Sequence, residues 1–449
     1  MRKMVMFSLL GILLTCFLTC FAGVLFAAPA KPVIAGWATK LENQTLTVRW
    51  DTYYGEKGDK AVLLIDKENV AEQKPVDNDN PEGIQMGIFT VTGITKENMT
   101  LMVVLSNADG ATHSAPFKIG VGGEDPHAYK KTNINSGKWP ENAMVGYIDL
   151  ASVGAVASIT PKQLTEYSVV VFGFADDDGK IGADQLNQIK KMITMEKSGT
   201  INLLSIGGEH AHNIKINGDT VENLYDAVKT AGVDGVDFDV ENITDAPGLV
   251  TLADMLREKF GKDYFITAAP QLAGSSDNPG LYVAAAGVEW DFTTGVYDAI
   301  FVQAYNSGVA LTYPNPLDGG KLVNESDPDI VAAAYDSLEK KGKVNKNTKL
   351  LIGIPANAGA GTVHGNVWNF RKDKAGWDEA VDQISKSLKA IYENEKGIDG
   401  KQFGGMMVWS LGNDAMPDGY GVWKPKPEQE AINTPAYFFS ETLAPLVKK

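Results

Sequence analysis

The stretch Asp234-Gly-Val-Asp237-Phe-Asp239-Val-Glu241 decides how this chain is interpreted. In an extended strand, successive side chains alternate between two faces, so the carboxyl groups of Asp237, Asp239 and Glu241 point the same way. Asp234 lies three residues before Asp237 and is expected to face elsewhere. Burial and like charge both oppose the ionised form of neighbouring acids. The pattern therefore predicts a shared proton and one raised pKa, which a general acid working near neutral pH requires.

A solvated strand end and a metal site are the alternatives to acid–base chemistry for these three acids. A metal site would need histidine or further oxygen ligands nearby, and no histidine adjoins the motif. His210 and His212 are interpreted as loop residues. Acid–base chemistry is therefore favoured, with no metal and no cofactor expected.

The spacing of the acids also limits the mechanism. Asp239 and Glu241 lie roughly 6.6 Å apart at Cα in a strand, side by side on one face. An ordinary glycosidase instead places two carboxyl groups on opposite sides of the scissile bond. One of these acids can donate a proton, but the nucleophile must come from elsewhere. A sugar with a 2-acetamido group supplies it through the acetyl oxygen, in the substrate-assisted exception.

DGVDFDVE resembles the DxxDxDxE signature of glycoside hydrolase family 18, the chitinases and endo-β-N-acetylglucosaminidases. Further segments are similar to family strands and follow in the family's order. They are residues 204–208 (SxGG strand), 268–271 (the strand after the acids), 303–306 (QxYN strand) and 405–410 (last strand, with a tryptophan). Each match is weak alone, but together, across residues 143–445, they are specific.

The resemblance implies a role for each site residue. Glu241 is the general acid and then the base, Asp239 orients the acetamido group, and Asp237 modulates the charge of Asp239. Tyr305 donates its hydroxyl toward the acetamido oxygen. The remaining expected substrate-binding residues are Gln303, Trp409 as the floor beneath the sugar, Tyr147, Gln271 and Asn306. Two interpretations, outer sugar subsite or plain packing, are open for Trp139, Trp368 and Trp377.

The first 30 residues have the features of a secretory signal peptide. Arg2 and Lys3 precede an uncharged run to Ala28, and a cut after Ala30 leaves small residues at the junction. The run is long enough to span a bilayer, so an uncleaved anchor is the alternative. Both cysteines, Cys16 and Cys20, lie in this segment. An exported protein without disulfides suits a bacterial source, so we expect a secreted protein, extracellular or periplasmic.

Length and charge define the remaining expectations. The 449 residues suffice for two domains. A formal net charge of −15 makes nucleic acid and anionic membranes poor partners. We expect no stable membrane association after signal cleavage, and a monomer. A neutral polysaccharide is compatible with such a surface.

Residues 31–120 are predicted to form a small β-sandwich similar to immunoglobulin-like or fibronectin type III-like modules. The segment 44–50 alternates cleanly, with Leu46, Val48 and Trp50 on one face. Trp37 and Trp50 are expected to pack in its core. Residues 121–142 are predicted to be a linker.

Residues 143–449 are predicted to form a (β/α)8 TIM barrel. The expected strands are 143–148, 168–174, 200–206, 235–240, 264–269, 299–305, 349–354 and 405–410. The expected helices are 181–195, 221–230, 249–259, 329–341 and 377–394. Active sites of this fold lie at the C-terminal ends of the strands, where the acidic motif, Tyr305 and Trp409 all fall.

The gap between the last two strands, residues 355–403, is nearly filled by one expected helix. Many exo-acting family members insert a small α+β module there, so its absence implies an open groove and endo attack. The leading hypothesis is a chitinase with chitin or chito-oligosaccharides as partners. The alternatives are an endo-β-N-acetylglucosaminidase acting on N-glycan cores and a non-catalytic chitin-binding lectin.

Overall fold

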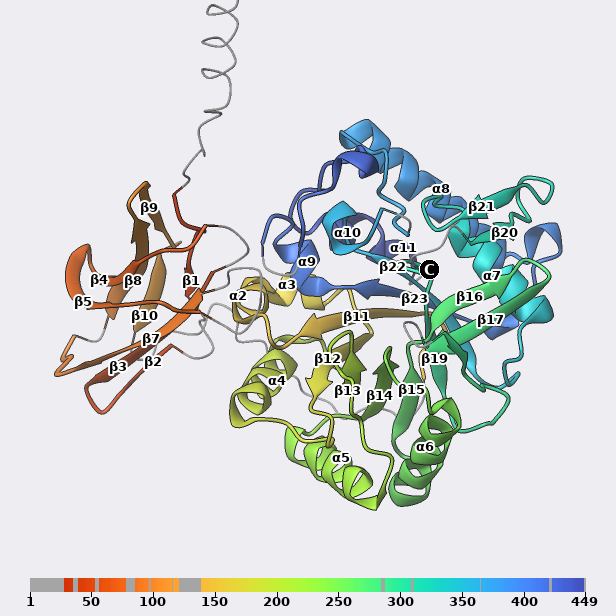
Figure 1. Ribbon diagram of the computed structural model, residues 1–449, viewed down its shortest axis with the longest axis horizontal. Coiled ribbons are helices and arrows are strands. Elements are labelled where there is room, and N and C mark those ends of the chain that lie inside the picture. Colours follow the sequence, from red (N-terminus) through yellow and green to blue (C-terminus); the bar gives the residue numbers. More distant parts are fainter. Residues whose placement is uncertain are drawn as a thin grey trace, which may run out of the picture.

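The computed structural model (Figure 1) describes residues 28–34, 39–52, 56–77, 85–96, 98–114, 116–120, 139–283, 287–307, 311–363, 365–419 and 422–447. Most of the expected signal segment, Trp37 and residues 121–138 of the expected linker lie outside these ranges. Among the helices that are described, none is long and apolar enough to cross a membrane.

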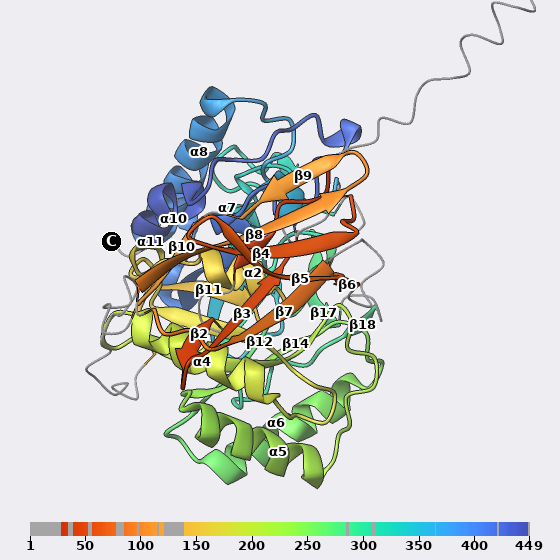
Figure 2. The ribbon, with the colours of Figure 1, turned by 90° about the vertical axis from the view of Figure 1, so that its left-hand side faces the viewer.

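Two five-stranded antiparallel sheets form the N-terminal part of the chain. One contains β1 (Val33–Ile34), β2 (Lys40–Glu42), β3 (Thr45–Asp51), β6 (Val76–Asp77) and β7 (Gln85–Thr92). The second sheet contains β4 (Lys60–Ile65), β5 (Glu68–Gln73), β8 (Asn98–Asn107), β9 (Gly110–His113) and β10 (Phe117–Gly120). Figure 2 shows these sheets in front of the rest of the molecule. The prediction of an all-β domain here is confirmed.

The core of this domain follows the predicted alternation along β3. Leu46, Val48 and Trp50 are fully buried, and the Trp50 ring packs against Phe89 with centroids 6.5 Å apart. On the opposite face of β3, the guanidinium of Arg49 contacts the carboxylate of Asp184 at 2.6 Å. This ion pair links the sandwich to the domain that follows.

Eight parallel strands close into a barrel, as predicted. They are β11 (Ala143–Asp149), β12 (Val169–Ala175), β13 (Ile201–Gly208), β14 (Gly235–Val240), β15 (Phe265–Ala268), β19 (Ala299–Gln303), β22 (Lys349–Pro355) and β23 (Phe403–Trp409). The first strand pairs with the last, with Ala143 opposite Gly405, and β15 closes onto β19 with Thr267 opposite Ala299.

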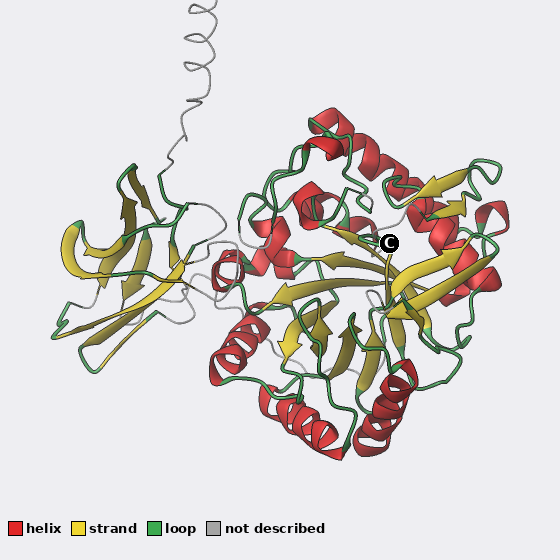
Figure 3. Cartoon of the chain, in the orientation of Figure 1, coloured by secondary structure: helices red, strands yellow, loops and turns green. Residues whose placement is uncertain are grey.

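Helices surround the barrel on its outside (Figure 3). They are α2 (Val153–Ser158), α3 (Pro161–Leu164), α4 (Ala183–Met195), α5 (Gly218–Ala231), α6 (Ala246–Phe260), α7 (Ile330–Lys341), α8 (Lys374–Tyr392), α9 (Leu411–Ala415), α10 (Phe438–Thr442) and α11 (Ala444–Val447). The five predicted helices correspond to α4 through α8. Helix α5 begins three residues earlier than predicted, because the Asn217 side chain caps it by accepting from the Thr220 N–H.

Alternation along the strands divides the apolar residues between two cores. On β11, Ala143, Val145 and Tyr147 face the barrel interior, while Met144 and Ile148 pack toward the helices. On β14, residues 236, 238 and 240 belong to the outer core. The intervening acids, residues 237 and 239, therefore face the interior of the barrel.

Two excursions from the barrel were not predicted. After β15 the chain forms β16 (Gln271–Ser275), β17 (Asn278–Val283) and β18 (Val288–Glu289), and β16 joins the wall by pairing with β19. A hairpin of β20 (Thr312–Pro314) and β21 (Leu322–Asn324) precedes α7.

The connection between β22 and β23 is short and helical. Its described residues form η2 (Ala358–Ala360), α8, η3 (Glu395–Gly397) and η4 (Gly400–Gln402). No strand occurs among them, which agrees with the expected lack of an inserted α+β module.

Candidate active site

The acidic motif lies along β14 and just beyond its C-terminal end. Asp237 and Asp239 are buried inside the barrel, and Glu241 follows the last strand residue, half-buried at the barrel mouth. Asp234 lies at the opposite end of the strand, where its carboxylate accepts the Asn202 N–H at 2.8 Å. The predicted separation of Asp234 from the three motif acids is confirmed.

Three hydroxyl groups hold Asp237 in place. The Tyr147 and Ser205 hydroxyls each donate to Oδ2 at 2.7 Å, and the Thr267 hydroxyl donates to Oδ1 at 2.6 Å. Burial raises the pKa of Asp237, and these three hydrogen bonds and the Phe238 N–H oppose that rise. Asp237 is thus a fixed carboxyl group at the base of the motif, with both of its oxygens hydrogen-bonded by the protein.

Asp239 accepts fewer hydrogen bonds than Asp237, and it is repelled by the acids on either side of it. Its Oδ1 accepts a hydrogen bond of 2.8 Å from Nε2 of Gln303. Burial raises the pKa of Asp239 well above its usual range, and the charges of Glu241 and Asp237 raise it further. Ionisation of the whole cluster is therefore disfavoured, which is the direction that the sequence predicts.

Glu241 has the protonation behaviour expected of a general acid. Burial raises its pKa from 4.5 to about 7, with an added contribution from the charge of Glu209. A carboxyl group with this pKa is partly protonated at neutral pH, and can donate a proton and later accept one.

Aromatic side chains line the barrel next to the acids. Tyr305 is buried, and burial followed by the charges of Asp239 and Glu241 raises the pKa of its hydroxyl, so it remains protonated. The Trp409 ring is only partly buried. It lies 5.7 Å from the Tyr147 ring and stacks on Phe174 with centroids 6.1 Å apart. This arrangement leaves an apolar surface beside the acids that suits the C–H face of a sugar.

Two of the expected substrate-binding residues are engaged by the protein itself. The amide of Gln271 donates to the backbone oxygens of Gln303 (2.8 Å) and Tyr305, so it fixes the end of β19. The side-chain oxygen of Asn306 accepts the Thr362 N–H at 2.6 Å. Both therefore help to position the backbone around Tyr305, and their expected contact with sugar stays a prediction.

The three candidate tryptophans beyond the motif pack in the protein. Trp368 is fully buried and its indole N–H donates to the Pro355 oxygen at 2.7 Å. Trp139 packs against Phe265, and Trp377 packs against Phe438. Packing is therefore the better interpretation for Trp368, whereas Trp139 and Trp377 are only partly buried and both interpretations stay open for them.

Some site residues were missed by sequence reasoning. Thr267 donates to Asp237, Phe174 supports Trp409, and Glu209 raises the pKa of Glu241. Thr267 had a detectable signal, because it is the residue of β15 directly opposite Asp237 once the two strands are aligned. In the described part of the chain, no three His, Cys, Asp or Glu side chains gather as a metal site would require.

Fold and site together define a barrel hydrolase of the glycoside hydrolase class. The chain belongs to glycosyl hydrolases family 18, whose model matches residues 143–414.

Similar proteins extend over part of the chain. It is 26% identical over 242 residues to "Class III chitinase" of Arthroderma benhamiae, covering 48% of this chain and 62% of that protein. It is 28% identical over 189 residues to "Endochitinase 33" of Trichoderma harzianum, covering 40% of this chain and 46% of that protein. The chain thus spans less than two thirds of the length of these curated relatives. A solved structure of a putative Chitinase A from Streptomyces coelicolor matches at 20% identity with a TM-score of 0.49, covering 68% of this chain and 98% of that chain.

Proposed function

We propose that the chain is an endo-acting chitinase that hydrolyses β-1,4 linkages between N-acetylglucosamine units. The observation that carries this proposal is that the three acids on one strand face differ in hydrogen bonding, burial and pKa. Asp237 is held by three hydroxyls, Asp239 is buried between two acids, and the pKa of Glu241 is raised to about 7. No second carboxylate across the groove is required if the substrate supplies the nucleophile.

In the proposed reaction, the acetamido oxygen attacks the anomeric carbon while the bond to the leaving sugar breaks. Glu241 transfers its proton to the leaving oxygen. Asp239 accepts the acetamido N–H, which stabilises the oxazolinium-like intermediate, and Asp237 compensates the change of charge on Asp239. Water then attacks the anomeric carbon, returns a proton to Glu241 and restores the acetamido group, with net retention of configuration.

The remaining site residues support binding. Trp409 forms the floor beneath the sugar ring, Tyr305 donates to the acetamido oxygen, and Gln303 keeps the Asp239 carboxyl group oriented. The short helical connection between β22 and β23 leaves the groove without an added wall, which favours attack within a polymer. The names of the two fungal relatives, both chitinases, are consistent with this substrate class.

The second candidate, an endo-β-N-acetylglucosaminidase acting on N-glycan cores, would use the same catalytic strand. Incubation with colloidal chitin and, separately, with a high-mannose glycoprotein distinguishes the two by their products. Release of soluble chito-oligomers from chitin supports the proposal. Release of glycans from the glycoprotein with no action on chitin would replace it. A non-catalytic chitin-binding protein would bind chitin and act on neither, which the presence of Glu241 disfavours.

The proposal includes the organisation of the whole chain. Residues 1–30 act as a cleaved signal, 31–120 form an immunoglobulin-like or fibronectin type III-like module, 121–142 link it, and 143–449 are catalytic. The protein would act outside the cytoplasm as a monomer, with no nucleic-acid or stable membrane partner and no metal. The expected bacterial source stays a prediction, since these two curated relatives are fungal.

A further inference from the structure

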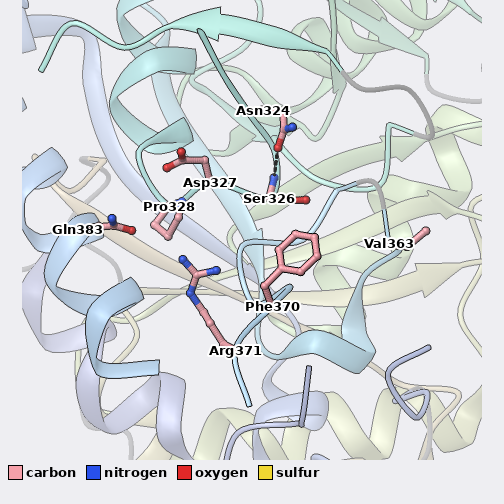
Figure 4. A pocket seen from close by; sticks show the side chains of 8 residues that line it. All are labelled: Asn324, Ser326, Asp327, Pro328, Val363, Phe370, Arg371 and Gln383. Carbon is pink, nitrogen blue, oxygen red and sulfur yellow. Dashed lines mark hydrogen bonds between the residues drawn. The ribbon is translucent and has the colours of Figure 1, made fainter. Parts of the chain in front are cut away.

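A cavity of about 550 Å³ lies between the segment joining β21 to α7 and the segment that follows η2 (Figure 4). Its lining includes Phe370, Arg371, Asp327, Asn324, Ser326 and, from α8, Gln383. None of these residues belongs to the acidic cluster or its aromatic surroundings. The volume is in the range of small-ligand sites.

Phe370 is presented to solvent by a constrained backbone. Its side chain is 61% exposed at the cavity, although a phenyl ring gains by burial. Its φ of +67° lies in the left-handed region, which bulky residues rarely adopt. The Phe370 N–H donates to the Gln429 oxygen at 2.7 Å, which fixes this conformation. A strained backbone that exposes an aromatic ring indicates a binding role better than a packing role.

The polar groups of the cavity suit a neutral, hydroxyl-rich ligand. Asp327 and Arg371 carry opposite charges, so the lining has no formal net charge. The lining also includes the uncharged polar side chains of Asn324 and Ser326. An exposed ring beside donors and acceptors matches a pyranose, which has an apolar C–H face and a rim of hydroxyls.

Both walls of the cavity are attached to the turn that follows the catalytic-site tyrosine. Asn306 accepts the Thr362 N–H on one wall, and the Ser307 hydroxyl donates at 2.8 Å to Glu325, which lies between the lining residues Asn324 and Ser326. These walls follow the C-terminal ends of β19 and β22. The cavity therefore lies on the same end of the barrel as the acids.

We propose that this cavity is a second saccharide-binding site, which holds a pyranose ring of a chito-oligosaccharide or chitin chain against Phe370. The inference rests on the proposed function, because it takes its ligand from the substrate class named there. Its effect would be to retain the polymer on the barrel face while the catalytic groove engages a chain.

The test compares ring removal with ring retention in the full chain. In a Glu241→Gln background, which prevents cleavage, calorimetric titration with N-acetylglucosamine hexamers should show two classes of site. Adding Phe370→Gly should abolish the second class, and adding Phe370→Tyr should preserve it. Glycine adopts the left-handed backbone conformation without strain, so the thermal unfolding midpoint of the Phe370→Gly variant should not fall. Leu322→Ala is the matched control, since Leu322 is 55% exposed in β21 but does not line the cavity.

Cleavage assays give the second readout. With Glu241 intact, Phe370→Gly should slow the release of soluble chito-oligomers at low concentrations of colloidal chitin. The expected reduction is about 2- to 12-fold, which corresponds to the free energy of one aromatic contact. Turnover of a short chromogenic substrate should not change. One class of site in the parent, or unchanged binding and polymer cleavage in Phe370→Gly, would overturn the second site. Failure of the unmodified chain to cleave any chito-saccharide would instead overturn the proposed function, and with it the ligand class assigned here.

Discussion

The hydroxyl of Tyr147, in the first barrel strand, donates a 2.7 Å hydrogen bond to the carboxyl group of Asp237, ninety residues further along the chain. This bond joins β11 to β14 across the interior of the barrel. It also opposes the burial that raises the pKa of Asp237. The first strand therefore takes part in setting the charge of the acidic motif.

Replacing Tyr147 by phenylalanine should destabilise the barrel and reduce turnover. The ring keeps its contacts with Trp409 and Phe301, but Asp237 loses one of three hydroxyl donors. A hydrogen bond to a charged group is worth about 1.5–3 kcal/mol, and its loss raises the pKa of Asp237 further. A buried acid whose pKa is raised in the folded state makes the protein less stable as pH rises. The loss of unfolding free energy caused by Tyr147→Phe should therefore grow from acid toward neutral pH.

Urea unfolding at several pH values measures this effect, with Tyr167→Phe as its control. Tyr167 also has a buried hydroxyl, bonded to Ser440 at 2.8 Å, away from the acids. Its variant should lose stability without losing turnover. Equal turnover in the Tyr147 and Tyr167 variants would contradict a role for Tyr147 in the site.

Replacing Glu241 by glutamine should abolish cleavage while leaving the fold and binding intact. The amide cannot deliver a proton to the leaving oxygen, and general acid catalysis is typically worth ~10²–10⁴-fold. Removing a charge from a crowded acidic strand relieves repulsion. Turnover and chito-oligomer binding are measured on the same preparation. Near-normal turnover would show that another residue is the acid.

The rate should fall as pH rises through about 7, because the proton on Glu241 is then lost. Glu209→Gln removes a nearby negative charge that raises the pKa of Glu241, so the alkaline limb should move to lower pH. Glu209 is exposed, so salt should screen its influence. Profiles of kcat/KM against pH at low and high salt test this. If the alkaline limb of the kcat/KM profile does not move in Glu209→Gln at low salt, Glu209 does not raise the pKa of Glu241 through its charge.

The N-acetyl group of the cleaved sugar should be required. If its oxygen is the nucleophile, hydrolysis should retain the β configuration, and chitosan should resist cleavage wherever the sugar before the bond lacks acetyl. NMR of early products, before mutarotation, reports the anomer. Formation of the α-anomer, or equal cleavage after glucosamine, would rule out participation by the substrate.

Glu325→Gln should flatten the dependence of stability on pH. Glu325 is fully buried, accepts two bonds from Ser307, and burial raises its pKa from 4.5 to about 7. The folded state therefore holds this proton more tightly, and stability falls as pH rises from 4.5 to 7, by about 3 kcal/mol for this group. Unfolding at pH 5 and pH 8 measures the difference. Parallel behaviour of variant and parent would show that Glu325 does not titrate in this window.

The barrel strands and the inward direction of Asp237 and Asp239 could be predicted because both follow from local patterns. Apolar runs of strand length recur between amphipathic helices, and a period of two fixes which side chains share a face. The hairpin of β20 and β21 was missed, because strands of three residues have too few positions for a pattern. The hydrogen-bond partners of Asn306 and Gln271 could not be predicted from the sequence, because they are backbone atoms that only the fold brings close. The proximity of Glu209 to Glu241 also arises only from the fold.

The pairing of β11 with β23 has a consequence for how the chain folds. Ala143 meets Gly405 only after 262 further residues have been made, which takes about 13–52 s at ordinary rates of synthesis. Throughout that time one edge of a largely apolar strand lacks its partner, and such an edge readily pairs with other chains. Barrel closure is a contact of very long sequence separation, which makes it slow. The stage at which this protein is most exposed to aggregation is therefore before its last strand arrives.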